Sequence, residues 1–499
     1  MKKKILVIFG CAFLWLSLAM GLMMCGFIYL FGSMSMDRLL FHLSTSQNGV
    51  PISTFIIMGL SIVILPTLAM LLVLFWPNIL KKIFKVERAW FVRARLLGAV
   101  FISVFSLVFV ELSLHPVSYI FAQNMESRFF VEHYVNPKEA KIVAPKHKKN
   151  LIWIWMESLE SSFMDVDNGG NNQENVIESL TELAKEYTNF SWNDKYGGFF
   201  PVNTATHTIG GQVAQMGGVP FFSKIGSSSS GSIRPGKEIE NRPIRPFMAG
   251  MYNLGDVLLS NGYKNVFVSG ADSRFGDQNQ LFLQHGNFEI MDYEWMRKNK
   301  HIPEDYFVFW GAEDDKVFSA AKPKLLELAR GDQPFQLHIE TMDTHAEDGY
   351  VTANTPNKFS DQYSNVLSGS AKHVNEFVRW CQRQEFYKDT VIVIVGDHLT
   401  MDHDYPSRLV NPEKRSVFNV IINSDRVARN DKNRVATSFD IFPTVLYSLG
   451  FEWNGDRLGL GVNLYSGEKT LAEMMGLDKL NEAIYRKSTF YRKNIQREK

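Results

Sequence analysis

The sequence predicts an α/β fold in which helices sandwich a mainly parallel sheet, preceded by an α-helical membrane anchor. Three observations lead to this prediction. Long uncharged apolar runs fill much of the first 122 residues of this 499-residue chain. Beyond residue 150, short runs that are apolar on both faces alternate with helix-like stretches, which is the pattern of a buried parallel sheet. Acidic, imidazole and hydroxyl side chains follow several of these runs, at the sheet edge where such folds bind ligands.

The anchor is expected to contain about three membrane-spanning helices, since a bilayer core needs roughly 20 apolar residues. The uncharged runs span residues 5–31, 52–80 and 96–121, the last interrupted by Glu111, His115 and Pro116. Lysines at positions 2–4 and a basic loop at 81–95 predict that both lie on the cytoplasmic side. The chain after residue 122 would then be extracytoplasmic.

Glu111 lies near the expected outer end of the third span. Two interpretations remain open for it. Its carboxylate either reaches water at the end of the helix or binds a lipid head group, since charged residues within a membrane are often functional.

The remainder of the chain has the composition of a water-exposed protein. Five short apolar runs are expected to form strands, namely LIWIWM (151–156), NVFVSG (265–270), FQLHIE (335–340), TVIVIVGD (390–397) and VFNVIIN (417–423). Helix-like stretches lie between or after them at 174–188, 252–261, 315–330, 363–385 and 438–449. This alternation favours βα units and a parallel sheet.

We expect a linker at 123–149, an α/β domain at 150–470 and a basic tail at 471–499, which is either solvated or in contact with anionic lipid. The Ser- and Gly-rich stretch 223–237 reads as a surface loop or as a lid over a site. The formal net charge of +1 gives no indication of nucleic-acid binding. Only Cys381 lies outside the apolar anchor, so this part has no internal disulfide.

Four strand ends or turns carry unusual polar residues. These are Glu157 and Ser158 after the first run, Thr208 at the start of a short helix, Asp343, His345 and Asp348 after the third run, and Asp397 and His398 at the end of the fourth. Each has an ordinary structural interpretation: a threonine at a helix start is commonly an N-cap, for example. Their placement at one edge of one sheet favours a shared site.

Glu157, Asp397 and His398 together form an oxygen-rich set with one imidazole, which suits a single divalent cation. A metal-bound hydroxyl has a lowered pKa and becomes a nucleophile near neutral pH, and Thr208 would supply that hydroxyl. Amides at the start of its helix would favour developing negative charge. Attack on phosphorus would then proceed through a phosphothreonine intermediate.

Gly210 and Gly211 follow the threonine. Without side chains, they would let a phosphate approach the backbone closely.

At these residues the sequence resembles the alkaline-phosphatase/sulfatase superfamily, and within it the lipoteichoic acid synthases and the phosphoglycerol transferases that modify periplasmic glucans. The resemblance covers about residues 148–465. It is carried by LIWIWMESLE, THTIGGQVAQMGGVP, GYKNVFVSGADSRFGDQNQLFLQHGNFE, WGAEDDKVF, TMDTHAEDGY and VIVIVGDHL.

The resemblance implies roles for individual residues. It places the nucleophile at Thr208 and the metal ligands at Glu157, Thr208, Asp397 and His398. Contacts with the substrate would come from Arg274, Trp310, His345 and Asp348. It further implies one divalent ion, Mn²⁺ or Mg²⁺ rather than Zn²⁺, and a multi-pass protein of the bacterial cytoplasmic membrane. The donor would be a phospholipid such as phosphatidylglycerol, and the acceptor a glycan or polymer.

The sequence also departs from that pattern. Ser269 or a neighbour stands where the synthases carry a histidine, and SRFGDQ replaces their Trp-Asn-Arg motif. The sulfatase signature Cys-x-Pro-x-Arg is absent, which argues against hydrolysis of sulfate esters. Two alternatives stay open: a phosphoethanolamine transferase, although such relatives commonly carry several disulfides, and a membrane-tethered binding protein without catalysis.

Overall fold

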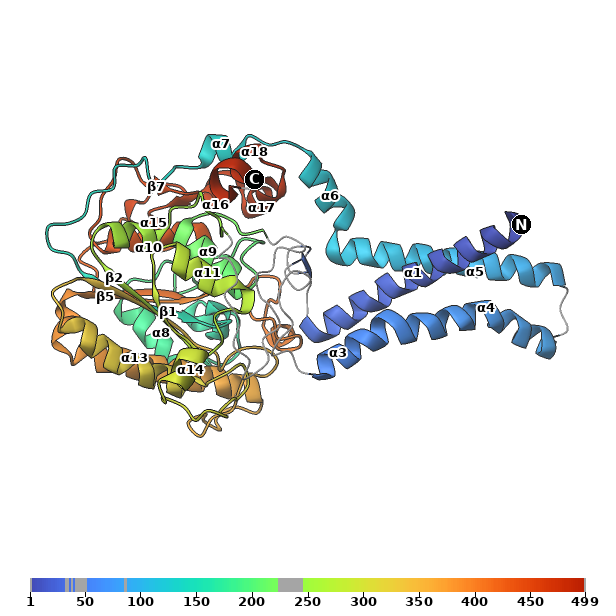
Figure 1. Ribbon diagram of the computed structural model, residues 1–499, viewed down its shortest axis with the longest axis horizontal. Coiled ribbons are helices and arrows are strands. Elements are labelled where there is room, and N and C mark those ends of the chain that lie inside the picture. Colours follow the sequence, from blue (N-terminus) through green and yellow to red (C-terminus); the bar gives the residue numbers. More distant parts are fainter. Residues whose placement is uncertain are drawn as a thin grey trace. The chain divides into compact units, whose positions relative to one another are not determined.

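The structure is a computed structural model that describes residues 2–31, 36, 39–40, 52–84, 88–222 and 246–497 (Figure 1). The chain forms two compact units. The anchor unit contains residues 1–39 and 49–121, and the α/β unit contains residues 40–48 and 122–499. The stretch 223–237, interpreted above as a loop or lid, lies outside the described residues.

Long apolar helices form the anchor unit. They are α1 (Lys2–Phe31), α3 (Ile52–Gly59), α4 (Leu65–Phe84) and α5 (Arg88–Leu114), with a π-helical turn at Leu60–Ile64 between α3 and α4. Three stretches are long and apolar enough to cross a membrane: Val7–Tyr29, Ile56–Phe75 and Leu96–Leu114. They coincide with the apolar runs in the sequence, although the third is shorter than expected.

The third span ends before Pro116 instead of continuing to residue 121. His115 has a positive φ of 51°, and α6 (Pro116–Asn124) begins directly after it. A proline disfavours helical backbone in the residue before it, and it suits the first position of a new helix. The Glu111 carboxylate accepts hydrogen bonds from the Val117 amide (3.0 Å) and the Ser118 hydroxyl (3.5 Å). Glu111 therefore caps the first turn of α6, a role that neither interpretation of this residue included.

A six-stranded sheet lies at the centre of the α/β unit, in the order β3-β2-β4-β1-β5-β6. Its strands are β1 (Asn150–Met156), β2 (Lys264–Ser269), β3 (Glu289–Met291), β4 (Phe335–Glu340), β5 (Thr390–Gly396) and β6 (Asn419–Ile422). All neighbours pair in parallel except β5 and β6. The sequence analysis missed the short edge strand β3 and a small hairpin of β7 (Arg457–Leu458) and β8 (Gly461–Val462).

Alternating side chains of β1 enter two separate hydrophobic cores, one on each face of the sheet. Leu151, Trp153 and Trp155 belong to one core, and Ile152, Ile154 and Met156 to the other. Because both faces are covered, the strand is apolar at every position from Leu151 to Met156, as its sequence predicted.

Helices cover both faces (Figure 1). The core of Trp153 and Trp155 is closed by α9 (Thr208–Gly217), α10 (Leu254–Ser260), α11 (Gln278–Gln284) and α15 (Ile441–Ser448). The opposite core is closed by α8 (Glu178–Glu186), α12 (Tyr293–Lys298), α13 (Asp314–Ala329) and α14 (Gln362–Gln382). The predicted helices at 174–188, 252–261, 315–330, 363–385 and 438–449 correspond to α8, α10, α13, α14 and α15.

The segments expected to be a linker and a tail are folded parts of the α/β unit. In the expected linker, Phe130 is buried in α7 (Phe129–His133). The expected tail forms α16 (Leu471–Met475), α17 (Leu477–Tyr485) and α18 (Thr489–Tyr491), and it buries Ile484, Tyr491 and Ile495 in the Trp153 core. The basic residues toward the end of this segment suggested a tail, although apolar residues are spaced along it.

Candidate metal and nucleophile site

Three potential metal ligands meet where two central strands end. Glu157 directly follows β1, and Asp397 and His398 directly follow β5. Because β1 and β5 are parallel neighbours that pair Met156 with Gly396, their carboxyl ends lie side by side. One potential ligand atom of each residue lies within 4.8 Å of the others, and all three side chains are buried.

Backbone hydrogen bonding determines which nitrogen of His398 faces this cluster. Its Nδ1 lies 2.8 Å from the carbonyl oxygen of Leu399, which can only accept, so Nδ1 carries the proton. In the neutral ring, the lone pair of Nε2 then points toward oxygens of Asp397 (3.3 Å) and Glu157 (3.6 Å). Three electron-rich atoms facing one another would bind a cation favourably. Orienting one ring nitrogen through the other is typical of metal-binding histidines.

Asp397 fits the same interpretation. Its Oδ1 accepts hydrogen bonds from the amides of Ser158 (2.9 Å) and His398 (2.8 Å), which fix the carboxylate. Its Oδ2 is buried and accepts no hydrogen bond from any described residue. Burial raises the pKa of Asp397 to about 7, and the charge of Glu157 contributes to this shift. A buried oxygen without a donor, beside a carboxylate and an imidazole, fits a divalent cation.

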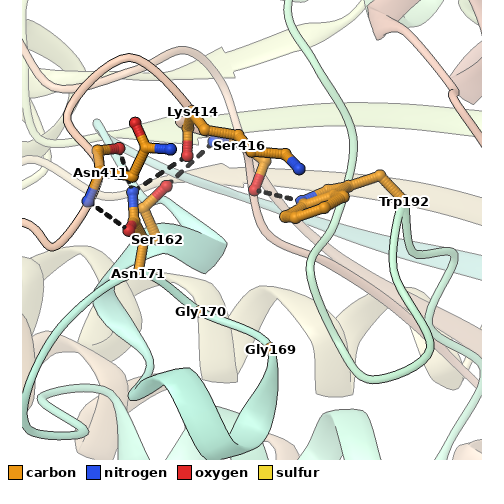
Figure 2. Close-up of a pocket in the computed structure, with 8 residues that line it drawn as sticks. All are labelled: Ser162, Gly169, Gly170, Asn171, Trp192, Asn411, Lys414 and Ser416. Carbon is orange, nitrogen blue, oxygen red and sulfur yellow. Dashed lines mark hydrogen bonds between the residues drawn. The ribbon is translucent and has the colours of Figure 1, made fainter.

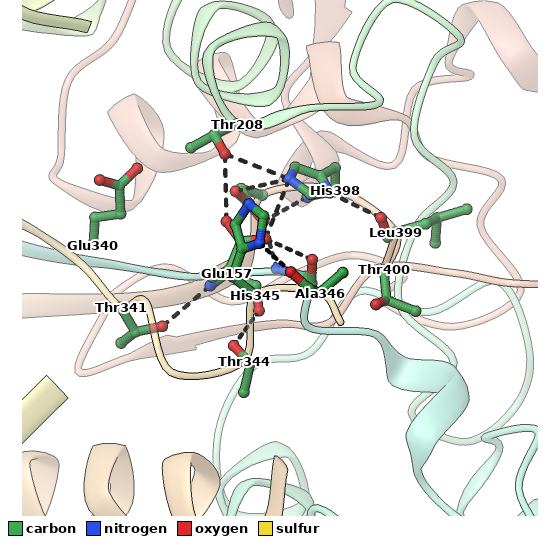
Figure 3. A network of polar contacts seen from close by, with 12 residues as sticks. Glu157, Thr208, Glu340, Thr341, Thr344, His345, Ala346, His398, Leu399 and Thr400 are labelled. Atoms are coloured by element: carbon green, nitrogen blue, oxygen red, sulfur yellow. Dashed lines mark hydrogen bonds and ion pairs between the residues drawn. The ribbon is translucent and has the colours of Figure 1, made fainter. Parts of the chain in front are cut away.

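The Thr208 hydroxyl lies beside this cluster (Figure 3). Its Oγ1 is 3.3 Å from Glu157 Oε2 and 3.5 Å from His398 Nε2. Thr208 is the first residue of α9, so the amides at the start of the helix lie close to its side chain. The structure therefore brings together all four residues that the sequence analysis assigned to metal binding and nucleophilic attack.

The glycines after Thr208 serve packing in this structure. A Cβ on Gly211 would lie 2.3 Å from the carbonyl oxygen of Asp397, and one on Gly210 would lie 2.4 Å from that of Thr204. The side-chain amide of Gln215 also bonds to the Gly396 carbonyl at 2.9 Å. Thus α9 rests directly on the end of β5, and this close approach gives both glycines a packing role besides the predicted approach of a phosphate.

Two of the expected substrate residues lie together. The rings of His345 and Trp310 are 4.6 Å apart between centroids. His345 Nδ1 donates to the Ala346 carbonyl at 2.8 Å, and desolvation lowers the pKa of its imidazole to about 4. Charge interactions with His398 and Asp397 also act on the pKa of this imidazole.

Arg274 is held by acidic neighbours. Its Nε donates to Asp272 at 2.7 Å, a second nitrogen also bonds to Asp272, and Glu294 lies 3.6 Å away. The hydrogen bonds that Arg274 donates to Asp272 raise the pKa of the guanidinium. The next residue, Phe275, contacts Trp310 at 5.6 Å between ring centroids, so this loop adjoins the aromatic side of the site.

Asp348 adjoins a second group of acidic residues. Its amide donates to Asp402 at 3.0 Å, and it adjoins a second group of potential ligands formed by Glu347, Asp402, His403 and Asp404. Burial and the charge of Asp402 raise the pKa of Asp348. The structure thus places Asp348 beside this second group of potential ligands.

The sequence analysis missed several residues that hold the site together. The Thr341 hydroxyl accepts from the Glu157 amide at 3.1 Å, and the Thr344 hydroxyl donates to the Glu157 carbonyl at 2.6 Å. Glu340 is buried at the end of β4 and bonds to Gln212 in α9 at 3.0 Å. Glu340 stands out in the sequence as a charged residue at the end of a buried strand. Its partner Gln212 lies 128 positions away, so the contact between them could not be inferred from the sequence.

A separate pocket of about 270 Å³ is lined by Ser162, Gly169, Gly170, Asn171, Trp192, Asn411, Lys414 and Ser416 (Figure 2). Its polar groups bond to one another: the Asn171 amide donates to the carbonyls of Asn411 and Lys414, and the Trp192 indole donates to Ser416. None of the expected site residues lines it.

Comparison with known proteins supports one family. The family model described as "Sulfatase" matches residues 149–451. Phosphoglycerol transferase I from Salmonella choleraesuis is 30% identical over 346 residues, which are 68% of this chain and 41% of that relative. The same-named protein from an Escherichia coli strain is 29% identical over the same shares. The chain therefore spans about two fifths of the length of these curated relatives.

Solved structures were also matched. Lipoteichoic acid synthase LtaP from Listeria monocytogenes has a TM-score of 0.49 at 17% identity and covers 65% of this chain and 79% of its own. The lipooligosaccharide phosphoethanolamine transferase EptA from Neisseria meningitidis has a TM-score of 0.49 at 13% identity, with coverages of 88% and 83%.

Proposed function

This chain belongs to the sulfatase family, and from that premise we propose that it is a membrane-anchored, metal-dependent phosphotransferase that uses Thr208 as nucleophile. The proposed donor is a phospholipid such as phosphatidylglycerol, the transferred group is glycerol phosphate, and the acceptor is an extracytoplasmic glycan or polymer. One observation carries the proposal: the Thr208 hydroxyl lies 3.3 Å from Glu157 and 3.5 Å from His398 in a buried cluster that fits a cation.

The proposed chemistry consists of two displacements at phosphorus. Thr208 Oγ1 forms a bond to the donor phosphorus while its proton passes to Glu157 Oε2, and the bond from phosphorus to the diacylglycerol oxygen breaks as that oxygen takes up a proton from water. An acceptor hydroxyl then attacks the phosphothreonine and loses its proton to the hydroxide left by that water, while the bond from phosphorus to Thr208 Oγ1 breaks and Oγ1 takes its proton back from Glu157. A divalent ion held by Glu157, Asp397 and His398, Mn²⁺ or Mg²⁺ rather than Zn²⁺, would supply positive charge that lowers the pKa of the hydroxyl.

Two observations favour glycerol phosphate over ethanolamine phosphate. The curated relatives at 29–30% identity bear the name phosphoglycerol transferase I. Disulfides, common in ethanolamine phosphate transferases, are absent among the described residues, because Cys11 and Cys25 lie in the anchor unit and Cys381 is buried and free.

The anchor supports a membrane-bound donor. Three helices are long and apolar enough to cross a membrane, and by the positive-inside rule the basic residues at positions 2–4 and 81–95 support an α/β unit outside the cytoplasm. We propose the bacterial cytoplasmic membrane as its location.

The proposal is tested with the full chain in lipid nanodiscs supplied with Mn²⁺. Two donors are offered in parallel: phosphatidylglycerol labelled in its glycerol head group and phosphatidylethanolamine labelled in its ethanolamine. Two quantities are measured, namely the diacylglycerol that is released and the label that becomes attached to the protein. We expect turnover with phosphatidylglycerol and a trapped phosphate on the peptide that contains Thr208.

Thr208→Val keeps the shape of the side chain without the hydroxyl, and we expect turnover to fall by about 10³-fold or more. Thr208→Ser retains the hydroxyl and should keep measurable activity. Turnover by the valine variant at the wild-type rate would refute Thr208 as nucleophile, while turnover of only the ethanolamine lipid would overturn the assignment of the donor.

A further inference from the structure

Glu340 is a buried carboxyl group that the proposed chemistry does not use. It is the last residue of β4, and 2% of its surface is exposed. Among the described residues its hydrogen-bond partners are uncharged, and burial raises the pKa of this carboxyl to about 8. Burying an acid without a cationic partner costs free energy that an apolar residue at this position would avoid. The contacts of Glu340 therefore indicate what role it has.

Glu340 is shared by two segments that are distant in sequence. Its Oε1 accepts hydrogen bonds from the side-chain amides of Gln212 (3.0 Å) and Gln278 (2.5 Å). The same Gln278 amide also bonds to Gln212 Oε1 at 3.2 Å. Its Oε2 accepts from the Ser269 hydroxyl at 2.7 Å. All four side chains are buried, so water does not compete for these bonds.

The side-chain amides of Gln212 and Gln278 connect Glu340 to two different parts of the site. Gln212 lies four residues after Thr208, one turn further along the same face of α9. Gln278 begins α11 and lies four residues after Arg274 in the loop that adjoins Trp310.

The strand end that carries Glu340 also reaches the metal cluster. The next residue, Thr341, holds the Glu157 amide at 3.1 Å (Figure 3). The end of β4 is therefore a common support for three parts of the site. They are α9, the nucleophile helix that begins with Thr208; the loop around Arg274, called the Arg274 loop; and the metal ligand Glu157.

We propose that Glu340 is a positioning residue that holds the nucleophile helix and the Arg274 loop in register with the metal ligands through Gln212 and Gln278. The inference rests on the proposed function for the roles of Thr208 and Arg274. Glu340 itself does not touch the reacting atoms. Because small displacements of a nucleophile cost large factors in rate, loss of this support should lower activity without removing any reacting group.

The test compares two substitutions in the full chain. Glu340→Gln keeps an oxygen for the two glutamine amides and places its own amide against the Ser269 hydroxyl, so kcat and KM should stay within about threefold of wild type. Glu340→Leu removes all the bonds, and we expect kcat to fall and KM to rise, each by about tenfold or more. Gln212→Leu should act mainly on kcat and Gln278→Leu mainly on KM, a split that general destabilisation would not produce.

Hydrogen exchange supplies a readout that does not depend on turnover. Glu340→Leu should speed amide exchange in 208–217 and 272–278 while exchange in β1 and β5 is unchanged, and Glu340→Gln should match wild type. Wild-type kinetics and exchange in Glu340→Leu, or faster exchange throughout the α/β unit, would overturn the inference. If wild type turns over neither phospholipid, the proposed function fails, and the exchange pattern still decides the role of Glu340.

Discussion

At the scale of single residues, the cluster of Glu157, Asp397 and His398 can bind one positive charge, either a metal ion or a proton. Without a metal, a proton takes that place, because burial raises the pKa of Asp397 to about 7. The folded pKa of this acid lies above its unfolded value near 4, so the protonated form stabilises the metal-free protein at low pH. That contribution is lost as the pH rises through 7, where a divalent cation can replace the proton.

We therefore expect the affinity for Mn²⁺ to rise with pH by about tenfold per unit up to about pH 7 and to level off above it, because binding displaces one proton. Calorimetric titration of the full chain between pH 5.5 and 8.5 measures this. An affinity that does not change with pH would contradict the assignment of Asp397 as a ligand.

A matched pair of variants separates the two groups of potential ligands. His398→Gln should abolish tight binding of Mn²⁺, because it removes the Nε2 lone pair from the buried cluster. His403→Gln alters the group of Glu347, Asp402, His403 and Asp404, and it should leave the binding at Glu157 unchanged.

At the scale of elements, the position of α9 relative to β5 sets the geometry of the nucleophile. Gly211→Ala would place a methyl group 2.3 Å from the Asp397 carbonyl, which is backbone and cannot move aside cheaply. We expect α9 to shift, turnover to fall by about tenfold or more, and stability to drop by about 1–3 kcal/mol. Kinetics and thermal unfolding of the full chain measure both effects.

Gly217→Ala, in the same helix, is the control for this substitution. Its added methyl group would meet the sulfur of Met251 at 2.6 Å, and a flexible methionine side chain can adjust. Turnover by Gly217→Ala should remain near that of wild type. Equal losses in both variants would show that helix propensity or general strain, not the contact with Asp397, controls activity.

The C-terminal segment makes a second prediction at this scale. Ile495 is fully buried in the core of Trp153, whereas Lys493 in the same turn is exposed. Ile495→Ala should therefore lower the free energy of unfolding by about 2 kcal/mol or more, and Lys493→Ala should change it by less than about 0.5 kcal/mol. Denaturant unfolding measures both, and a harmless Ile495→Ala would show that the segment is only a solvated tail.

At the scale of the whole molecule, the chain divides into a unit whose helices are long and apolar enough to cross a membrane and an α/β unit that contains every proposed catalytic group. The anchor would restrict the enzyme to the surface that holds its donor, which raises the effective concentration of substrate without adding a contact.

A fragment of residues 122–499 tests this division of labour. In mixed micelles we expect it to turn over phosphatidylglycerol at a rate similar to that of the full chain, because the site is complete. On intact vesicles its rate should fall by about tenfold or more, and fusion of an unrelated membrane helix should restore it. A fragment that is inactive in micelles although it is folded by circular dichroism would show that the anchor contributes to the site itself.

The sequence by itself determined five of the six strands of the central sheet and the four residues that meet in the metal and nucleophile cluster. Strands buried on both faces are apolar almost throughout, as β1 is from Leu151 and β5 from Val391 onward, so they stand out from helices and loops. Because parallel strands end at one edge, Glu157, Asp397 and His398 could be placed together before their contacts were known. The long uncharged runs determined the anchor in the same way, since a lipid core accepts little else.

Only the tertiary structure decided what depends on contacts between distant segments. It placed Asp348 beside Asp402, gave Gly211 a packing role against Asp397, and folded the C-terminal segment into the core. It also joined Glu340 to Gln212 and Gln278. A pattern of hydrophobicity reports which side of an element is buried, but the partner of a buried polar group is fixed by the packing of the whole chain.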